Sequence, residues 1–203
     1  FWVTRAPGPG LNVRGASWEA ECHVDHKAPS TTTEYSAALQ GVPVPVLSHE
    51  NAQYEVYPDY SEIKKYRGVL KARNFELFRE RLVAAGMLDQ AVDFMKASGA
   101  LSVICHREDI EACLRTPGFG GCQMLDLQDF SGQGTALVGK LNVFMESKGL
   151  ITPKAWREFC CETVPLLWMR KYTWTKDETF TARIRVAHYG PADLVGQSLT
   201  WTI

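Results

Sequence analysis

The chain has 203 residues, of which 45% are hydrophobic and 22% are charged, and this ordinary globular composition argues against a disordered or membrane-embedded protein. Its 22 basic residues nearly balance 23 acidic ones. The net charge near zero therefore does not indicate binding to nucleic acid or to an anionic membrane. The sequence contains no apolar run long enough to cross a bilayer. Function must therefore be read from local sites.

The first forty residues predict a strand end followed by a long loop. Residues 1–4 form an apolar run with no turn before it, so we expect the chain to be a piece of a larger protein. Residues 5–40 are rich in Gly, Pro, Ser and Thr, which favours a loop with a short helix over 33–39. Residues 22–26 include metal-ligand types, but no second cluster completes a site, so no metal or other cofactor is predicted.

Two segments with opposite signatures come next. The β-branched run 42–47 predicts a buried strand, and it stops at the polar residues 48–51. Asp59 with Glu62 three residues on is typical of a helix start, and the helix is expected to continue to about Ala85. A second helix is predicted over 87–97, with Gly99 ending it.

A second strand is expected after further helix. Residues 101–104 are ambiguous, 108–115 resume a helix, and Thr116 with the Pro and Gly after it ends that helix. Residues 120–130 look like a strand that ends in carboxylates and amides. Two strands separated by helices, each polar at its exit, predict a parallel α/β arrangement.

The pattern changes in the last part of the chain. A helix is predicted to begin at Thr152 and to fade near Val164. Residues 180–186 and 199–203 alternate apolar and polar side chains, which is typical of half-buried antiparallel strands. We therefore predict two domains, over residues 1–172 and 173–203.

Carboxylates that follow parallel strands are the first candidates for chemistry. In a (β/α)₈ barrel the reacting groups project from the carboxyl ends of strands, which places Glu50 and residues 126–129 at such a position. Hydrolysis of a glycosidic bond requires two carboxyl groups on either side of that bond. A carboxylate after a strand also often caps the next helix, so Glu50 alone leaves both interpretations open.

Two stretches resemble the end of a glycosidase barrel. Residues 45–54, with the Tyr-Pro pair at 57–58, resemble the seventh barrel strand of glycoside hydrolase family 2 and its relatives, the β-galactosidase, β-mannosidase and β-glucuronidase group. Residues 121–130 are similar to the eighth strand, and residues 134–149 to the passage into the last helix. The resemblance covers about residues 40–203. It implies the C-terminal part of a (β/α)₈ TIM barrel followed by the start of an immunoglobulin-like β-sandwich.

The same resemblance implies a retaining glycoside hydrolase in which Glu50 is the nucleophile. The family's acid/base lies in an Asn-Glu pair, and no such pair precedes Glu50, so the acid/base is expected elsewhere in the parent polypeptide. The isolated chain is then expected to be inactive, since both carboxyl groups must flank the bond. Met124-Leu125 replaces the family's usual Trp, and Asn51-Ala52 stands where a Gly is common, so the substrate departs from the family pattern.

Substrate contacts are expected from polar and aromatic side chains around Glu50. Hydrogen bonds to sugar hydroxyls are expected from His49, Gln53, Asp126 and Asp129, and stacking on a pyranose ring from Tyr54 and Trp2. Arg5 could grip the carboxylate of a uronic acid such as galacturonate. The implied substrate is a plant or host polysaccharide or oligosaccharide, and the implied location is the periplasm or exterior of a bacterium.

Two other classes of protein stay open. One is a non-catalytic carbohydrate-binding or scaffolding protein that presents aromatic side chains. The other is a cysteine hydrolase built on Cys105 and His106, although neighbours in sequence seldom form a nucleophile and its base. Most of the six cysteines are expected to be small buried apolar residues.

Overall fold

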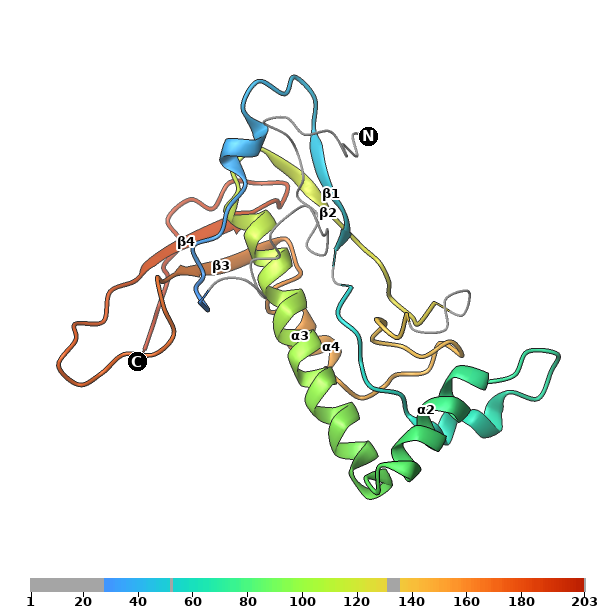
Figure 1. The fold of residues 1–203 in the computed structure, drawn as a ribbon. Helices are drawn as coiled ribbons and strands as arrows, with labels where there is room; N and C mark the ends of the chain where they lie inside the picture. The colour runs from blue at the N-terminus through green and yellow to red at the C-terminus, as the bar shows by residue number, and fades with distance from the viewer. Residues whose placement is uncertain (1–27, 52, 131–135, 203) are drawn as a thin grey trace.

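The computed structural model describes residues 28–51, 53–130 and 136–202, without the side chains of Ala38, His49 and Glu50. Within these residues the chain forms a mixed α/β structure in which one long helix lies between two small sheets (Figure 1). The elements in chain order are η1 (Ser36–Leu39), β1 (Val46–Asn51), η2 (Tyr60–Lys65), α2 (Arg73–Ala84), η3 (Leu88–Gln90), α3 (Ala91–Arg115), β2 (Phe119–Met124), α4 (Pro153–Trp156), β3 (Thr163–Trp168) and β4 (Arg183–His188).

Strands β1 and β2 form a parallel pair joined by a connection that contains α2 and α3. Leu47 is the register partner of Gly121, and Ser48 that of Cys122. Val46 and Phe119 pack with Cys113 of α3 in one hydrophobic cluster, so the end of α3 covers the pair. The parallel pairing predicted from the sequence is confirmed.

Helix α3 is one continuous helix of 25 residues, so the prediction that Gly99 ends a shorter helix is wrong. A Cβ atom at position 99 would lie 2.3 Å from Cδ2 of Leu150. Glycine is therefore present because Leu150 packs directly on the helix backbone. The helix ends at Arg115 as expected, where Thr116 follows with its Oγ1 donating to the carbonyl of Ala112.

The helix predicted from Asp59 to Ala85 is also interrupted. Asp59 accepts a hydrogen bond from the backbone of Ser61 at 2.9 Å, as a capping residue should, but the short helix η2 ends at Lys65 and α2 begins only at Arg73. Ala72 and Phe75 at the start of α2 pack with Leu137 in a second cluster. The intervening loop around Gly68 is exposed, and a Cβ atom added at Gly68 would meet nothing within 4 Å.

Strand β2 ends at Met124, six residues before the predicted end. The chain beyond it pairs with a later segment instead, since the carbonyl of Leu127 accepts from the backbone of both Lys140 and Leu141. A Cβ atom on Gly139 would lie 2.2 Å from the carbonyl carbon of Gln128, so the two backbones lie in close contact there. Residues 127–129 therefore pair with residues 139–141 instead of extending β2.

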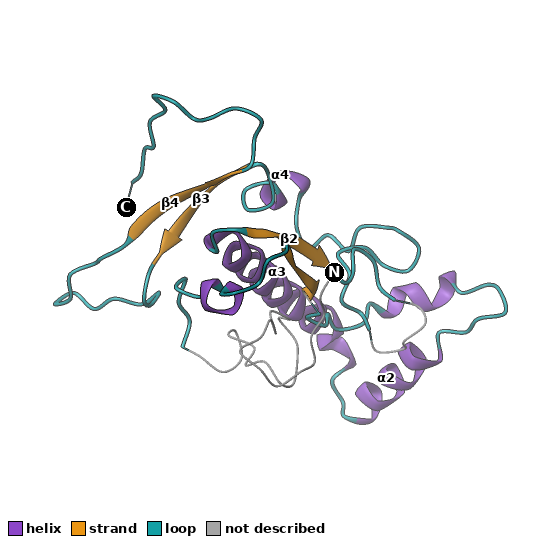
Figure 2. Ribbon diagram, turned by 90° about the horizontal axis from the view of Figure 1, so that it is seen from above, coloured by secondary structure: helices purple, strands orange, loops and turns teal. Residues whose placement is uncertain are grey.

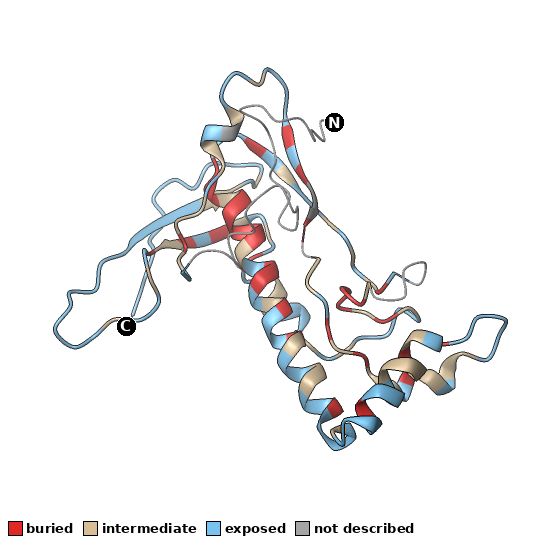
Figure 3. Cartoon of the chain, viewed as in Figure 1, coloured by how far each residue is buried: buried red, intermediate tan, exposed pale blue. Residues whose placement is uncertain are grey.

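The second sheet joins β3 and β4 in antiparallel register. The predicted helix reaches only Trp156, and β3 begins at Thr163 where the helix was expected to fade. β3 lies before the predicted domain boundary near Thr173 and β4 after it, so this sheet spans the boundary. Figure 2 shows β3 and β4 side by side. Val164 and Leu166 of β3 are buried, whereas most of β4 is exposed (Figure 3).

The last predicted strand does not form over residues 199–202. Leu199 and Trp201, which were expected to be half-buried in it, are exposed. A strand is stable only when a neighbouring segment satisfies its backbone groups. The described residues thus contain two two-stranded sheets, and the complete barrel and sandwich stay predictions. No helix among the described residues is both long and apolar enough to cross a membrane.

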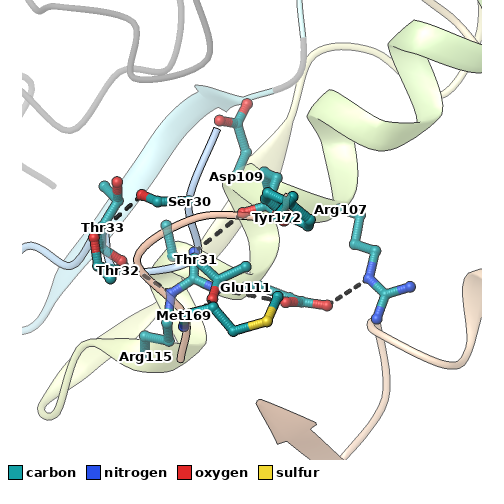
Figure 4. A network of polar contacts seen from close by, with 12 residues as sticks. Ser30, Thr31, Thr32, Thr33, Arg107, Asp109, Glu111, Arg115, Met169 and Tyr172 are labelled. Atoms are coloured by element: carbon teal, nitrogen blue, oxygen red, sulfur yellow. Dashed lines mark hydrogen bonds and ion pairs between the residues drawn. The ribbon is translucent and has the colours of Figure 1, made fainter. Parts of the chain in front are cut away.

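A polar network fastens the segment before β1 to α3 and to the chain after β3 (Figure 4). The buried guanidinium of Arg115 donates to the carbonyl of Thr33 at 3.0 Å and pairs with Glu111 at 3.4 Å. Thr31 and Met169 exchange two hydrogen bonds, at 2.9 and 2.7 Å. Segments far apart in sequence are therefore held at the C-terminal half of α3.

Candidate active site

The carboxyl ends of β1 and β2 form a common edge. The backbone amide of Leu125 donates to the carbonyl of Asn51 at 3.0 Å, which continues the pairing beyond the last residue of each strand. The backbone of Glu50 lies in β1 one residue before this edge, and Asp126 lies two residues after the end of β2. Parallel strands bring such positions together.

Several predicted site residues lie outside the described part of the chain. Trp2, Arg5 and the cluster 22–26 belong to the undescribed first segment. The backbone of His49 and Glu50 is part of β1, but their side chains are not described. Their proposed roles therefore stay predictions.

Two buried polar side chains flank positions 49 and 50 and hold β1 on α3. The thiol of Cys113 donates to Oγ of Ser48 at 3.5 Å, and Nδ2 of Asn51 donates to Sγ of Cys113 at 3.7 Å. Ser48 and Asn51 are 1% and 3% exposed, so these contacts are protected from water. The polar residues after the apolar run thus include two whose role is to fix the strand.

The side chain of Tyr54 is engaged by α3. Its hydroxyl donates to Oδ1 of Asp109 at 3.2 Å, and its ring centroid lies 6.0 Å from that of His106. Tyr54 is half-buried, as is Gln53 before it. The contact with Asp109 fixes Tyr54 by an interaction within the protein, while the predicted stacking on a sugar is untested.

The two predicted aspartates have different surroundings. Asp126 is half-buried, and its carboxylate accepts from the backbone of Leu127 at 2.7 Å in a contact open to solvent. Asp129 is 4% exposed and accepts from the backbone of Gly139 at 3.0 Å and from Nζ of Lys148 at 2.5 Å. Burial nevertheless raises the pKa of Asp129. Asp126 is the one of the two that solvent and ligands can reach.

Asp129 also lines a cavity of about 100 Å³, together with Glu62, Asn142 and Lys148. Glu62 is 4% exposed, and its Oε2 atom has no hydrogen-bond partner among the described residues. Burial raises the pKa of Glu62, the hydrogen bond with Asn142 opposes this rise, and the negative charge of Asp129 adds to it. A carboxyl group of this kind can retain its proton and donate it.

Sequence reasoning assigned Glu62 to helix capping and did not predict this cavity. Asp59 does cap the helix, but Glu62 turns inward to Asn142, which lies eighty positions along the chain. No local pattern connects Glu62 with Asn142 or Lys148. The one sequence feature that indicated a polar site here was a second carboxylate, Asp129, placed after a predicted strand.

A buried amine was likewise not predicted. Nζ of Lys140 donates to Oγ of Ser102 at 2.6 Å, and that hydroxyl donates to the carbonyl of Tyr54 at 3.2 Å. Burial lowers the pKa of Lys140 to about 7, and the positive charge of Lys148 adds to the effect. Lys140 also lines a cavity of about 250 Å³ whose other walls include Leu127 and Trp156.

The alternative nucleophile and base are enclosed in the core. Cys105 and His106 follow each other on α3 and are 2% and 0% exposed. The ring of His106 packs between those of Tyr54 and Trp156, at 6.0 Å from each. This burial argues against an open site for cysteine hydrolysis, because a substrate must reach the sulfur.

Comparison with protein-family models and with curated proteins finds no match to this chain. Among the described residues no group of three or more His, Cys, Asp or Glu side chains could hold a metal ion. The candidate active site is therefore defined by position and chemistry alone, as the common edge of β1 and β2 with Glu50 and Asp126.

Proposed function

We propose that this chain supplies the nucleophile of a retaining glycoside hydrolase. The observation that carries the proposal is the parallel pairing of β1 with β2, because it puts Glu50 and Asp126 at the same edge. That edge is where the sequence resemblance to family 2 glycosidases locates the nucleophile. Position and resemblance together support Glu50 as the proposed nucleophile.

In the proposed reaction the carboxylate of Glu50 attacks the anomeric carbon and forms a glycosyl-enzyme. The acid that protonates the leaving oxygen is a second carboxyl group about 5 Å away, contributed by another part of the parent polypeptide. The same group then removes a proton from the water that releases the sugar. The proposed role of this chain is to hold the nucleophile and part of the sugar.

The proposed substrate contacts follow from accessibility. Asp126 is half-buried near the edge, with a carboxylate open to solvent that is suited to accept from sugar hydroxyls, whereas Asp129 is already paired with Lys148. His49, Gln53 and Tyr54 surround Glu50 in the sequence and are proposed to contact the ring. A uronic acid would add a carboxylate that an arginine such as Arg5 can bind with two parallel hydrogen bonds.

The wider proposal follows from resemblance. The chain would form the end of a (β/α)₈ barrel over residues 1–172 and the first strands of an immunoglobulin-like sandwich over 173–203. It would act on plant or host glycans in the periplasm or outside a bacterial cell. The partners are then a carbohydrate substrate and the remainder of the parent polypeptide.

The test compares the full-length parent protein with its Glu50→Gln and Glu55→Gln variants. Glu55 is an exposed carboxylate five residues further on, and it serves as the matched control. Each protein is incubated with aryl glycosides, including galacturonides, and the released aryl alcohol is followed. We expect the wild type and Glu55→Gln to cleave one sugar and Glu50→Gln to lose several orders of magnitude in rate.

Two outcomes would contradict the proposal. Full activity of Glu50→Gln would exclude Glu50 as the nucleophile. If neither wild type nor variant cleaves any glycoside but both bind oligosaccharides, the protein is a non-catalytic carbohydrate-binding protein. Tyr189 and Trp201 in the last segment, which are 59% and 65% exposed, would then be the first aromatic side chains to replace.

A further inference from the structure

Two cysteines from different elements meet beside β1. Cys113 lies in the last turn of α3 and is 4% exposed, while Cys122 lies in β2 and is exposed. Cys113 contacts Oγ of Ser48 at 3.5 Å, and Ser48 is the register partner of Cys122 on the neighbouring strand. Because paired residues of neighbouring strands lie on the same face of a sheet, Cys113 packs on the face that carries Cys122.

The two thiols differ in access and in acidity. Cys122 is exposed, and the neighbouring Cys113 lowers the pKa of Cys122 despite partial burial. The neighbouring Cys122 and burial raise the pKa of Cys113, so its sulfur keeps its proton. An accessible cysteine of lowered pKa next to a protected thiol is the arrangement in which one cysteine reacts with an oxidant and the other resolves the product.

We propose that Cys122 and Cys113 form an oxidation site that a hydroperoxide converts to a reversible disulfide. The Cys122 thiolate attacks one peroxide oxygen, the O–O bond breaks, and the second oxygen leaves as hydroxide, which gives a sulfenic acid at Cys122. The sulfur of Cys113 then attacks the sulfur of Cys122, the S–O bond breaks, and hydroxide leaves with the thiol proton as water. Two thiols lose two electrons in total, and hydrogen peroxide is reduced to two waters.

The bond would change the support of β1. In the reduced protein the sulfur of Cys113 accepts from Asn51 and its thiol donates to Ser48, the two residues that flank positions 49 and 50. A disulfide removes the thiol proton and therefore the hydrogen bond to Ser48. The formation of the disulfide does not depend on the proposed glycosidase function.

A third cysteine provides the internal control. Cys160 is also exposed, and it is close enough to Cys122 for a Cys122 thiolate to raise its pKa. Its own pKa is raised mainly by burial, and the side chain of Trp156 provides its hydrogen bond. The structure therefore distinguishes Cys113 as the resolving partner from Cys160 as a bystander.

The experiment oxidises the reduced protein with hydrogen peroxide, blocks the remaining thiols with N-ethylmaleimide, and maps tryptic peptides by mass spectrometry without reduction. Trypsin puts Cys113 and Cys122 in separate peptides, residues 108–115 and 116–140, and Cys160 in a third. We expect a linked pair of the first two peptides that disappears on treatment with dithiothreitol. Absence of a linked pair, or a link from Cys122 to Cys160, would overturn the proposal.

Variants test the assigned roles separately. Cys122→Ser should abolish the linked peptide, and Cys160→Ser should leave it unchanged. Cys113→Ala should leave a sulfenic acid on Cys122, which dimedone traps as an adduct. A linked Cys113 in Cys122→Ser protein would contradict the role of Cys122, and the wild-type peptide map decides the proposal if the Cys113 variant does not fold.

Discussion

Replacing the buried amine of Lys140 by the thioether of Met should stabilise the protein at low pH and have little effect at high pH. Lys140 is 7% exposed, and its side chain donates to a single hydroxyl, Oγ of Ser102. Burial lowers its pKa from an ordinary 10.5 to about 7. The substitution keeps the length of the side chain and removes the charge.

The sign of the effect follows from proton binding. Below about pH 7 the amine is protonated in both the folded and the unfolded chain, so the folded protein bears the full cost of burying a charge. Between pH 7 and the ordinary pKa the folded amine is neutral while the unfolded amine keeps its proton. The free energy of unfolding therefore rises with pH, by about 1.4 kcal/mol per unit.

The magnitude is set by the size of the shift. The full change in pKa corresponds to about 5 kcal/mol, to order of magnitude, and the part realised between about pH 6 and pH 9.5 is roughly 3 kcal/mol. Lys140→Met should therefore be more stable than wild type by roughly this amount at the lower pH. At the higher pH the advantage should vanish, since the variant also loses a hydrogen bond worth about 1 kcal/mol.

The assay is urea unfolding of both proteins at the two pH values, followed by tryptophan fluorescence. Lys154→Met is the control, because Lys154 is exposed and its replacement should change stability equally at both pH values. Other titrating groups cancel when variant and wild type are compared at the same pH. Equal stability differences for Lys140→Met at both pH values would refute the assignment of a buried, deprotonated amine.

The parallel sheet could be predicted because its signals are local. The β-branched run before Ser48 and the polar residues after it identify a buried strand and its exit. The continuous helix α3 could not be predicted, because Gly99 is a good stop signal when only its neighbours are considered. Its real role is set by Leu150, which packs against the helix from fifty-one positions away.

The candidate site divides in the same way. Glu50 and Asp126 were identified from their positions after strands, which is a property of the sequence order. Glu62 and Lys140 were missed, because burial and partners decide their chemistry. The hydroxyl that binds Lys140 belongs to Ser102 on helix α3, and the sequence pattern around Lys140 does not predict that contact.

Three further substitutions test the packing and charges around the site. Gly139→Ala should destabilise the protein by about 1–3 kcal/mol in urea unfolding, because its Cβ would lie 2.2 Å from the backbone of Gln128, and an unchanged midpoint would contradict that contact. Arg115→Met should cost about 1–3 kcal/mol by the same measurement, since it removes the hydrogen bond to the carbonyl of Thr33 and one ion pair of the buried Glu111, which keeps Arg107 as a partner, and a loss below about 0.5 kcal/mol would mean that these contacts are solvated. Glu62→Gln tests the carboxyl group in the cavity through its pH dependence. Burial raises the pKa of Glu62, so the folded protein binds a proton more tightly than the unfolded chain, and wild-type stability falls as pH rises from the ordinary value of 4.5 through the raised pKa. The glutamine variant lacks this loss, and its stability relative to wild type should increase between about pH 4 and pH 8. A difference that stays constant over that range would show that Glu62 is ionised in the folded protein as readily as in water.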